Sequence, residues 1–335
     1  MTRECERRRI GIARLLIVWT ICGLNLAALT VPAASEDWPV RPIRLIIAAA
    51  AGGPNDLPAR LASQILAPKL GQPVVIEYQP GAGGAIGARA AAHAKPDGYT
   101  LFTGNTSTLA AIPAVSRSAG YDPVKDFIPI GKIAEGFLVL ATHPSSPWKT
   151  LKDFVSYAKA NPGKINYAHS GPGSLPNLAG EAFMLRSGIK LTGVPYRSGG
   201  ESVSAVLSQA VDATFENNVL VGRLASSGKL RALAVMNRTR MSIVPDVPTI
   251  AEAGYPGAEA NTFFGLVAPA GTPASIITRL NTILNEGLRD PAIQASMTKA
   301  GLAVDPGSPA DFAAFIAAQH QHWVEIGKAA GISID

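Results

Sequence analysis

Cysteine is nearly absent from this sequence. The two cysteines, Cys5 and Cys22, both lie in an N-terminal segment that we expect to be removed. The mature chain would then have no disulfide and no thiolate metal site. A chain of this length buries enough apolar surface to fold without disulfides, and 335 residues predict two domains.

Long hydrophobic runs are also scarce. The apolar stretch 15–29 is shorter than the roughly 20 residues that span a bilayer, and it contains Thr20 and Asn25. Arginines precede it and Ala33-Ala34-Ser35 follows, which is the layout of a secretory signal peptide. We expect residues 1–35 to be such a peptide, cleaved near Ala34 or Ser35. An uncleaved membrane anchor is the alternative.

Excess charge of one sign is modest. Lys and Arg total 30 against 24 Asp and Glu, a formal net charge of +6. Residues 1–35 hold five Arg and two Glu, so removal leaves 25 basic and 22 acidic residues, or +3. Since no basic run is interleaved with aromatic residues, nucleic acid is not an expected partner.

Catalytic and cofactor motifs are missing as well. There is no G-x-S-x-G elbow, and no two of the five histidines have the i, i+4 spacing of helical zinc ligands. His320 and His322 are expected to be solvated. Gly81, Gly83 and Gly87 have the wrong spacing for a dinucleotide fingerprint. We therefore expect no metal, no cofactor and no enzymatic activity.

Short apolar runs alternate with helical patterns along the mature chain, which is typical of an α/β protein with largely parallel sheets. The expected strands are 43–48, 74–78, 100–103, 138–142, 165–168, 191–195, 212–215, 230–235 and 265–268. Thr150 with Asp153, and Ser308 with Asp311, have the spacing of helix capping boxes.

No long flexible linker divides the chain. Two α/β domains would then be joined by strands that cross between them, with 138–142 and 264–268 as the candidates. This interpretation assigns residues 36–137 plus 265–335 to one lobe and 138–264 to the other. A cleft between such lobes would close by hinge bending.

Two glycine-rich turns each lie between a strand and a helix. They are 51–56, after the run 43–47, and 80–84, after the run 74–78. Glycine lets the backbone approach a ligand closely, and a helix start presents unpaired N–H groups with a partial positive charge. Such turns favour an anion, so the pair predicts a small acidic solute held by backbone groups.

Other loops at strand ends are rich in hydroxyl, amide and glycine groups. They are 104–108, 170–174, 196–200 and 216–218. Gly and Ser often do no more than form turns. Because ligands bind at the carboxyl ends of strands in open α/β sheets, several such loops favour a solute-binding cleft.

These residues carry a family resemblance. The motifs are Trp38-Pro39-Val40-Arg41-Pro42, the two glycine-rich turns, Pro96-Asp97-Gly98-Tyr99, Tyr121-Asp122-Pro123, Leu178-Ala179-Gly180-Glu181, Val194-Pro195-Tyr196, Asp246-Val247-Pro248-Thr249 and Glu252-Ala253-Gly254. From Trp38 to the C-terminus the chain resembles the solute-binding receptors of tripartite tricarboxylate transporters, the Bug family.

The resemblance implies a two-lobed α/β periplasmic-binding-protein fold of the Venus flytrap, type II-like kind, with two crossing strands. It further implies a monomeric periplasmic receptor that closes on an organic, acidic or aromatic acid and presents it to a membrane permease. Its implied carboxylate cradle is Ala51, Gly52, Gly53, Asp56, Gly83 and Gly84. The implied opposing wall is Thr106, Ser107, Ser170, Gly171, Ser174, Tyr196, Glu216 and Phe263.

Several positions differ from the family pattern. Asn177, which the resemblance also places among the ligand-binding residues, stands where His is common. Arg197 stands where Lys is frequent and Glu216 where Asp is frequent, and Ala48-Ala49 replaces a Pro-Phe-like pair. Glu216 is either solvated or salt-bridged at a hinge, or it faces the cleft and disfavours a second carboxylate. These differences leave the solute open.

Two other functions remain open at this point. An orphan or sensory receptor would signal to a membrane partner, and only genomic neighbourhood would separate it from a transport receptor. A secreted hydrolase would depend on Ser170 and Ser174, and Ser→Ala changes there would abolish its rate.

Overall fold

The computed structural model describes residues 38–332. The predicted signal peptide and its cleavage site lie outside the described residues. From Arg41 onward the chain belongs to one compact unit. Within the described part, no helix combines the length and apolar character needed to cross a bilayer.

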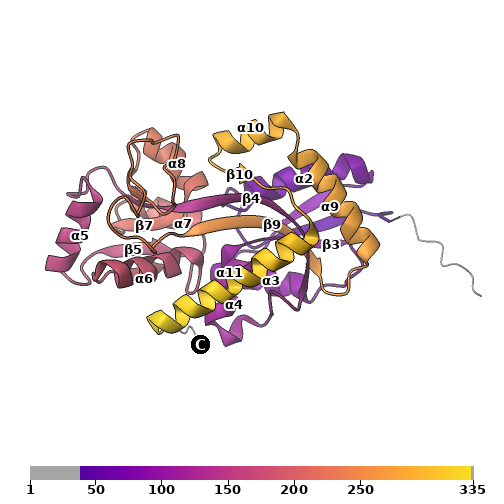
Figure 1. Ribbon diagram of the computed structural model, residues 1–335, viewed down its shortest axis with the longest axis horizontal. Helices are drawn as coiled ribbons and strands as arrows, with labels where there is room; N and C mark the ends of the chain where they lie inside the picture. Colours follow the sequence, from indigo (N-terminus) through magenta and orange to yellow (C-terminus); the bar gives the residue numbers. More distant parts are fainter. Residues whose placement is uncertain (1–37, 333–335) are drawn as a thin grey trace, which may run out of the picture. The chain divides into compact units, whose positions relative to one another are not determined.

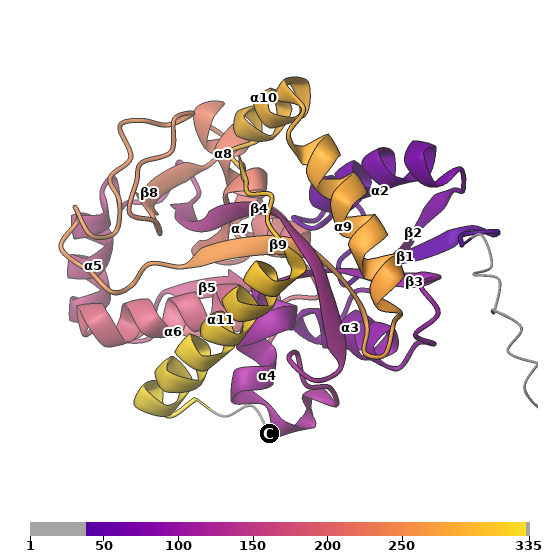
Figure 2. The same cartoon turned by 45° about the vertical axis from the view of Figure 1, so that its right-hand side comes forward.

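A parallel sheet begins the fold. Strands β1 (Ile43–Ile47), β2 (Val74–Tyr78) and β3 (Thr100–Asn105) pair in parallel, with β1 in the middle. Helix α2 (Asp56–Leu70) packs on β1 and β2, and helix α3 (Ala85–Ala92) packs on β1 and β3. Figure 2 shows α9 (Ala274–Leu288) beside α2. The carboxyl ends of these strands therefore lead directly into the two glycine-rich turns.

Two long antiparallel strands continue the sheet. Strand β4 (Phe127–Thr142) pairs with β9 (Asn261–Pro269) along its first part, and β9 also pairs with β3. The last part of β4, 138–142, pairs with β7 (Ala213–Asn217) and β8 (Arg231–Val235). The strand order is β2-β1-β3-β9-β4-β7-β5-β6. Strand β4 therefore links the two groups of strands.

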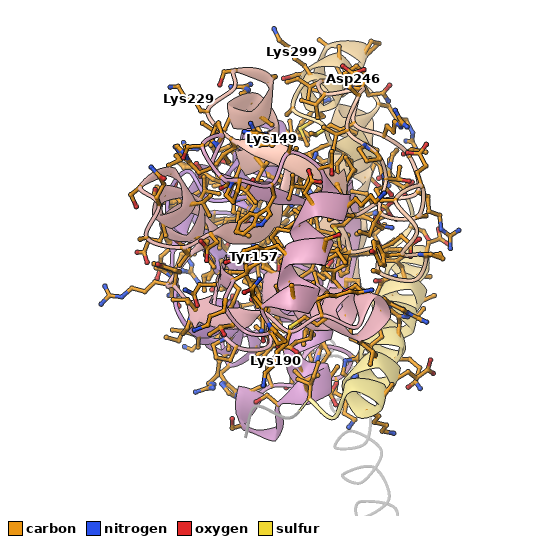
Figure 3. All side chains as sticks on the ribbon, turned by 90° about the vertical axis from the view of Figure 1, so that its left-hand side faces the viewer. Lys149, Tyr157, Lys190, Lys229, Asp246 and Lys299 are labelled. Atoms are coloured by element: carbon orange, nitrogen blue, oxygen red, sulfur yellow. The ribbon has the colours of Figure 1, made fainter. Side chains whose placement is uncertain are left out.

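The second group of strands is also covered by helices. Strand β5 (Asn166–His169) pairs in parallel with β6 (Thr192–Pro195) and β7. The surrounding helices are α5 (Leu151–Ala160), α6 (Leu175–Ser187), α7 (Gly199–Leu207) and α8 (Asn218–Ser226). Figure 1 shows these elements at one end of the molecule. Exposed Lys190 and Lys229 lie on opposite sides of this end in Figure 3.

The C-terminal segment returns along β4. It contains α10 (Pro291–Lys299), the short strand β10 (Ala303–Val304) paired with β4, and α11 (Pro309–Ala330). Helix α11 packs on β4, on α4 (Ile112–Val115) and on the π-helical turn η2 (Ser107–Ala111) (Figure 1). Short 3₁₀ turns, η1 (Ala82–Gly84) and η3 (Arg117–Ala119), complete the list.

One histidine prediction is wrong. His320 on α11 is half-buried, and its Nδ1 lies 3.0 Å from the carbonyl oxygen of Ala110. His322 is exposed, as expected. The helical spacing placed the two rings on different faces, but it could not show that one face meets η2.

A continuous apolar core runs along the sheet. Phe102 stacks on Phe127 at 5.7 Å, and Phe215 contacts Tyr167 at 5.5 Å and Phe183 at 5.8 Å. All five belong to one cluster of buried side chains. The loops at the strand ends are therefore held on a packed frame.

Candidate ligand-binding site

A small cavity of about 40 Å³ lies where several strand ends meet. Its lining residues follow β1, β2, β3, β5 and β6, and they are Ala48, Ala49, Gly53, Pro54, Asn55, Gly83, Gly84, Asn105, Ser107, Ser170, Arg197, Ser198 and Gly199. The structure thus brings both glycine-rich turns and three of the polar loops to one place. Five of the predicted site residues line it directly: Gly53, Gly83, Gly84, Ser107 and Ser170.

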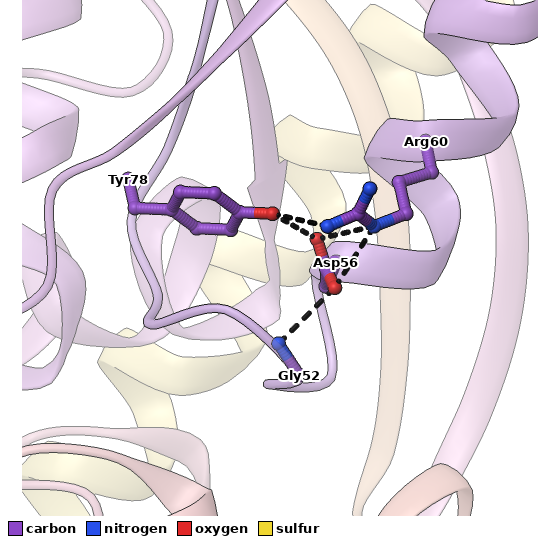
Figure 4. Close-up of polar contacts among 4 residues, drawn as sticks. All are labelled: Gly52, Asp56, Arg60 and Tyr78. Carbon is purple, nitrogen blue, oxygen red and sulfur yellow. Dashed lines mark hydrogen bonds and ion pairs between the residues drawn. The ribbon is translucent and has the colours of Figure 1, made fainter.

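The first turn is held by Asp56 (Figure 4). Its carboxylate accepts hydrogen bonds from the Gly52 N–H at 3.1 Å, the Arg60 Nε at 3.1 Å and the Tyr78 hydroxyl at 2.8 Å. Burial raises the pKa of Asp56, but the bonds from Tyr78, Gly52 and Arg60 together lower it below its usual value. Asp56 therefore positions the turn, and it lies outside the cavity lining together with Ala51 and Gly52.

The expectation that these turns offer mainly unpaired amides is partly wrong. Besides Gly52, the Gly53 N–H donates to Ala50 O at 3.0 Å, and the Gly84 N–H donates to Gly81 O at 2.9 Å. Among the described residues, the Gly83 N–H has no hydrogen-bond partner. The second turn therefore retains a free donor at the cavity wall.

The second turn has an unusual backbone. Gly83 has φ 66°, Gly84 φ 110°, and even Ala82 has φ 47°, in the left-handed region that side chains rarely adopt. Successive backbone N–H groups in such turns form concave sites for anions. A Cβ on Gly84 would lie 2.6 Å from Thr108 Cγ2, so glycine is required there.

The facing loop is already in contact with this turn. A Cβ on Gly171 would lie 2.9 Å from the Gly83 nitrogen. Ser107 Oγ accepts a hydrogen bond from the Leu175 N–H at 2.9 Å. Ser174 Oγ donates to Gly171 O at 2.7 Å and caps α6. The 170–174 loop and the second glycine-rich turn therefore meet beside the cavity, which is small in this structure.

Other predicted wall residues serve the scaffold. Thr106 Oγ1 accepts from the Phe263 N–H at 3.0 Å, and the Phe263 ring packs against Phe312 and Phe315. Asn177 Oδ1 accepts from the Gly173 N–H at 3.0 Å. The Tyr196 side chain packs on the apolar cluster that includes residues of α7, of α8 and of the last part of β4. None of these four side chains lines the cavity.

Glu216 lies under the cavity. It is 1% exposed, and its Oε2 accepts from the Asn217 N–H at 2.9 Å. The expectation of a solvated or salt-bridged Glu216 is wrong, since no ion pair to it exists among the described residues. Desolvation raises its pKa to about 7, although the Asn217 hydrogen bond opposes this shift.

Several lining residues were absent from the predicted site. Arg197 is exposed, and its guanidinium has no partner within the described part of the chain. Asn105 Nδ2 donates to Asn55 Oδ1 at 2.9 Å, and Ser198 caps α7. The sequence signal that could have identified them was Arg197 and Ser198, a cation and a hydroxyl shortly after the strand expected at 191–195, in the polar loop 196–200.

Comparison with known proteins identifies the family. The model of the tripartite tricarboxylate transporter family receptor, TctC, matches residues 59–332. This chain belongs to that family. Protein BugT of Bordetella pertussis (strain Tohama I) is 34% identical over 326 residues, which cover 97% of this chain and all of BugT.

Solved structures agree with this assignment. One described as a periplasmic transporter has a TM-score of 0.85 and 37% identity, covering 89% of this chain and 100% of its own. R. palustris Rpa4515 with adipate has a TM-score of 0.85 and 34% identity, covering 88% and 99%. The predicted periplasmic-binding-protein fold is confirmed. The chain is a periplasmic-type solute-binding receptor and not an enzyme.

Proposed function

We propose that this receptor binds a small organic carboxylate in the cavity and delivers it, as a monomer in the periplasm, to a tripartite tricarboxylate-type permease. The observation that carries the proposal is that Arg197 and Gly83 both line the cavity, while neither the Arg197 guanidinium nor the Gly83 N–H has a hydrogen-bond partner among the described residues. Rpa4515, which is 34% identical to this chain, was solved with adipate.

The donors supply enough attraction for useful affinity. Helices α2 and α7 begin at the cavity with Asn55 and Ser198, and each helix start contributes about 0.3–2 kcal/mol toward an anion. A hydrogen bond to a charged group contributes roughly 1.5–3 kcal/mol. Micromolar affinity requires about 8 kcal/mol. Several such contacts, formed in a closed cleft, would reach it.

Solute entry would require the facing loops to separate. The cavity holds about 40 Å³, whereas ligand pockets usually have at least about 300 Å³. The contacts that would part are Gly171 against Gly83 and the Leu175 N–H to Ser107 Oγ. In our proposal the movement occurs between 36–137 plus 265–335 and 138–264, and it bends where β4 and β9 connect them.

Calorimetric titration of the mature protein with aliphatic dicarboxylates of different length, adipate among them, tests the proposal. We expect at least one to bind, and Arg197→Gln to weaken it tenfold or more, since about 1.4 kcal/mol of one charged hydrogen bond suffices for tenfold. Arg289→Gln, at an exposed arginine that ends α9, is the matched control and should bind like wild type. If no carboxylate binds, or both variants bind equally well, the proposal is wrong.

A further inference from the structure

Glu216, at the end of β7, is a buried carboxyl group that no cation of residues 38–332 neutralises. Oε2 accepts the Asn217 N–H at 2.9 Å, while Oε1 has no hydrogen-bond partner among the described residues. Burying a carboxylate without compensation is costly in free energy. The protonation of the Glu216 carboxyl group is therefore sensitive to a small change in its surroundings.

The carboxyl group lies directly behind the cavity wall. A Cβ built on Gly199 would be 2.7 Å from Oε2 and 2.8 Å from Oε1, so the carboxyl group lies directly against the Gly199 backbone. Gly199 itself lines the cavity, beside Arg197 and Ser198. A solute carboxylate held by those residues would thus lie near Gly199, the residue that the Glu216 carboxyl group contacts.

Among the described residues, no charged side chain pairs with Glu216. The elements packed on β7 carry these ionisable side chains: Glu201 on α7, Arg223 on α8, Tyr167 and His169 on β5, Glu181 and Arg186 on α6, and Lys132 and Glu135 on β4; Arg197 lies two residues before α7. Among the described residues, none of them forms a hydrogen bond or ion pair with Glu216. The protonation of Glu216 therefore depends on burial and on what enters the cavity.

We propose that Glu216 takes up one proton when an anionic solute enters, so that it determines the pH range over which the receptor loads. This inference rests on the proposed carboxylate function. A second negative charge beside Gly199 disfavours ionised Glu216, and a proton from solvent removes the conflict. By linkage, protonated Glu216 binds the anion more tightly by the same factor.

The sign of the pH dependence of solute affinity follows from the pKa of Glu216 in the folded protein without and with solute. Burial raises the pKa of Glu216 in the solute-free protein to about 7, and the bound anion would raise it further. Affinity is then highest and constant below about pH 7, and it falls by up to tenfold per pH unit above it. The first carboxyl group of an aliphatic dicarboxylic acid, with a pKa near 4, is already ionised in that window.

Titration calorimetry between about pH 6 and about pH 9, with the dicarboxylate that binds best, tests the inference. Wild type should take up a fraction of one proton, measured from the difference in enthalpy between two buffers, and lose affinity above pH 7. Glu216→Gln should show neither effect. Glu325→Gln, the same change at an exposed position on α11, should behave like wild type.

His169 is the main alternative source of a pH dependence in solute affinity. Desolvation lowers its pKa below the usual value, so it should stay neutral above pH 7. If the pH dependence survives in Glu216→Gln, or is lost in His169→Gln instead, the inference is wrong.

A carboxyl ¹³C titration of wild type with and without solute gives the Glu216 pKa directly, should Glu216→Gln fail to fold. Binding without proton uptake would contradict only this inference, whereas no binding by any dicarboxylate would contradict the proposed function as well.

Discussion

At the residue scale, Asp56 shows how one side chain shapes the first glycine-rich turn. Its carboxylate holds Gly52, Arg60 and Tyr78 together, and the side chain is only 13% exposed. The family resemblance implied that Asp56 belongs to the carboxylate cradle. Hydrogen bonds between an aspartate and an amide four residues earlier depend on the final turn geometry, so periodicity and motif spacing could not assign them.

Replacing Asp56 with Asn should lower the free energy of unfolding by about 1–2 kcal/mol at neutral pH, since charged hydrogen bonds are lost. The folded pKa of Asp56 is lowered, so its stabilisation is present above the unfolded value of 3.8 and disappears as pH falls below it. Urea unfolding should therefore show wild type and D56N converging in acid. Asp246→Asn, at an exposed position (Figure 3), should differ little from wild type at either pH.

At the element scale, most strands were predicted within one or two residues because short apolar runs reveal them. The crossing strands were predicted too short. Strand β4 begins at Phe127 and not near residue 138, and its early part contains Pro129, Gly131 and two register shifts that interrupt the apolar pattern. Residues 107 and 108 were expected in a loop, but they begin the π-helical turn Ser107–Ala111, which packs against α11.

The capping boxes at α5 and α11 are confirmed by the structure. Thr150 Oγ1 accepts from the Asp153 N–H at 3.2 Å, and Asp153 Oδ2 accepts from the Thr150 N–H at 2.9 Å. Thr150→Ala should lower the free energy of unfolding by about 1 kcal/mol, measured by urea denaturation. Because α5 does not line the cavity, solute affinity should stay unchanged. A large loss of affinity would show that the helix influences the site.

At the scale of the whole molecule, closure of the cavity brings the 170–174 loop against the glycine-rich turn at Gly83. Gly171 has φ 109°, and a Cβ there would press on the Gly83 nitrogen. Gly171→Ala should therefore weaken solute binding at least tenfold, roughly the effect of 1.4 kcal/mol of strain in the closed form. Gly188→Ala is a matched control, since that glycine also has positive φ but has nothing within 4 Å of its Cβ position. Equal affinities of the two variants, measured by calorimetry, would contradict closure at Gly171.

The sequence predicted the α/β class, the family and the convergence of glycine-rich loops, because strand ends and motifs are local signals. It did not predict which atoms remain free. The amides of Gly52 and Gly53 form hydrogen bonds within their own turn, while Arg197, absent from the predicted site, lines the cavity. Such details arise from contacts between residues far apart in the chain.

The most direct test of the central claim is an amide and guanidinium NMR titration of the mature protein with adipate or another dicarboxylate that binds. The account predicts that the Gly83, Ser198 and Gly199 amides and the Arg197 guanidinium shift together and saturate at one affinity. It would be contradicted by saturating shifts confined to another groove, such as the one of about 470 Å³ lined by Arg223 and Lys299, with those four groups unmoved.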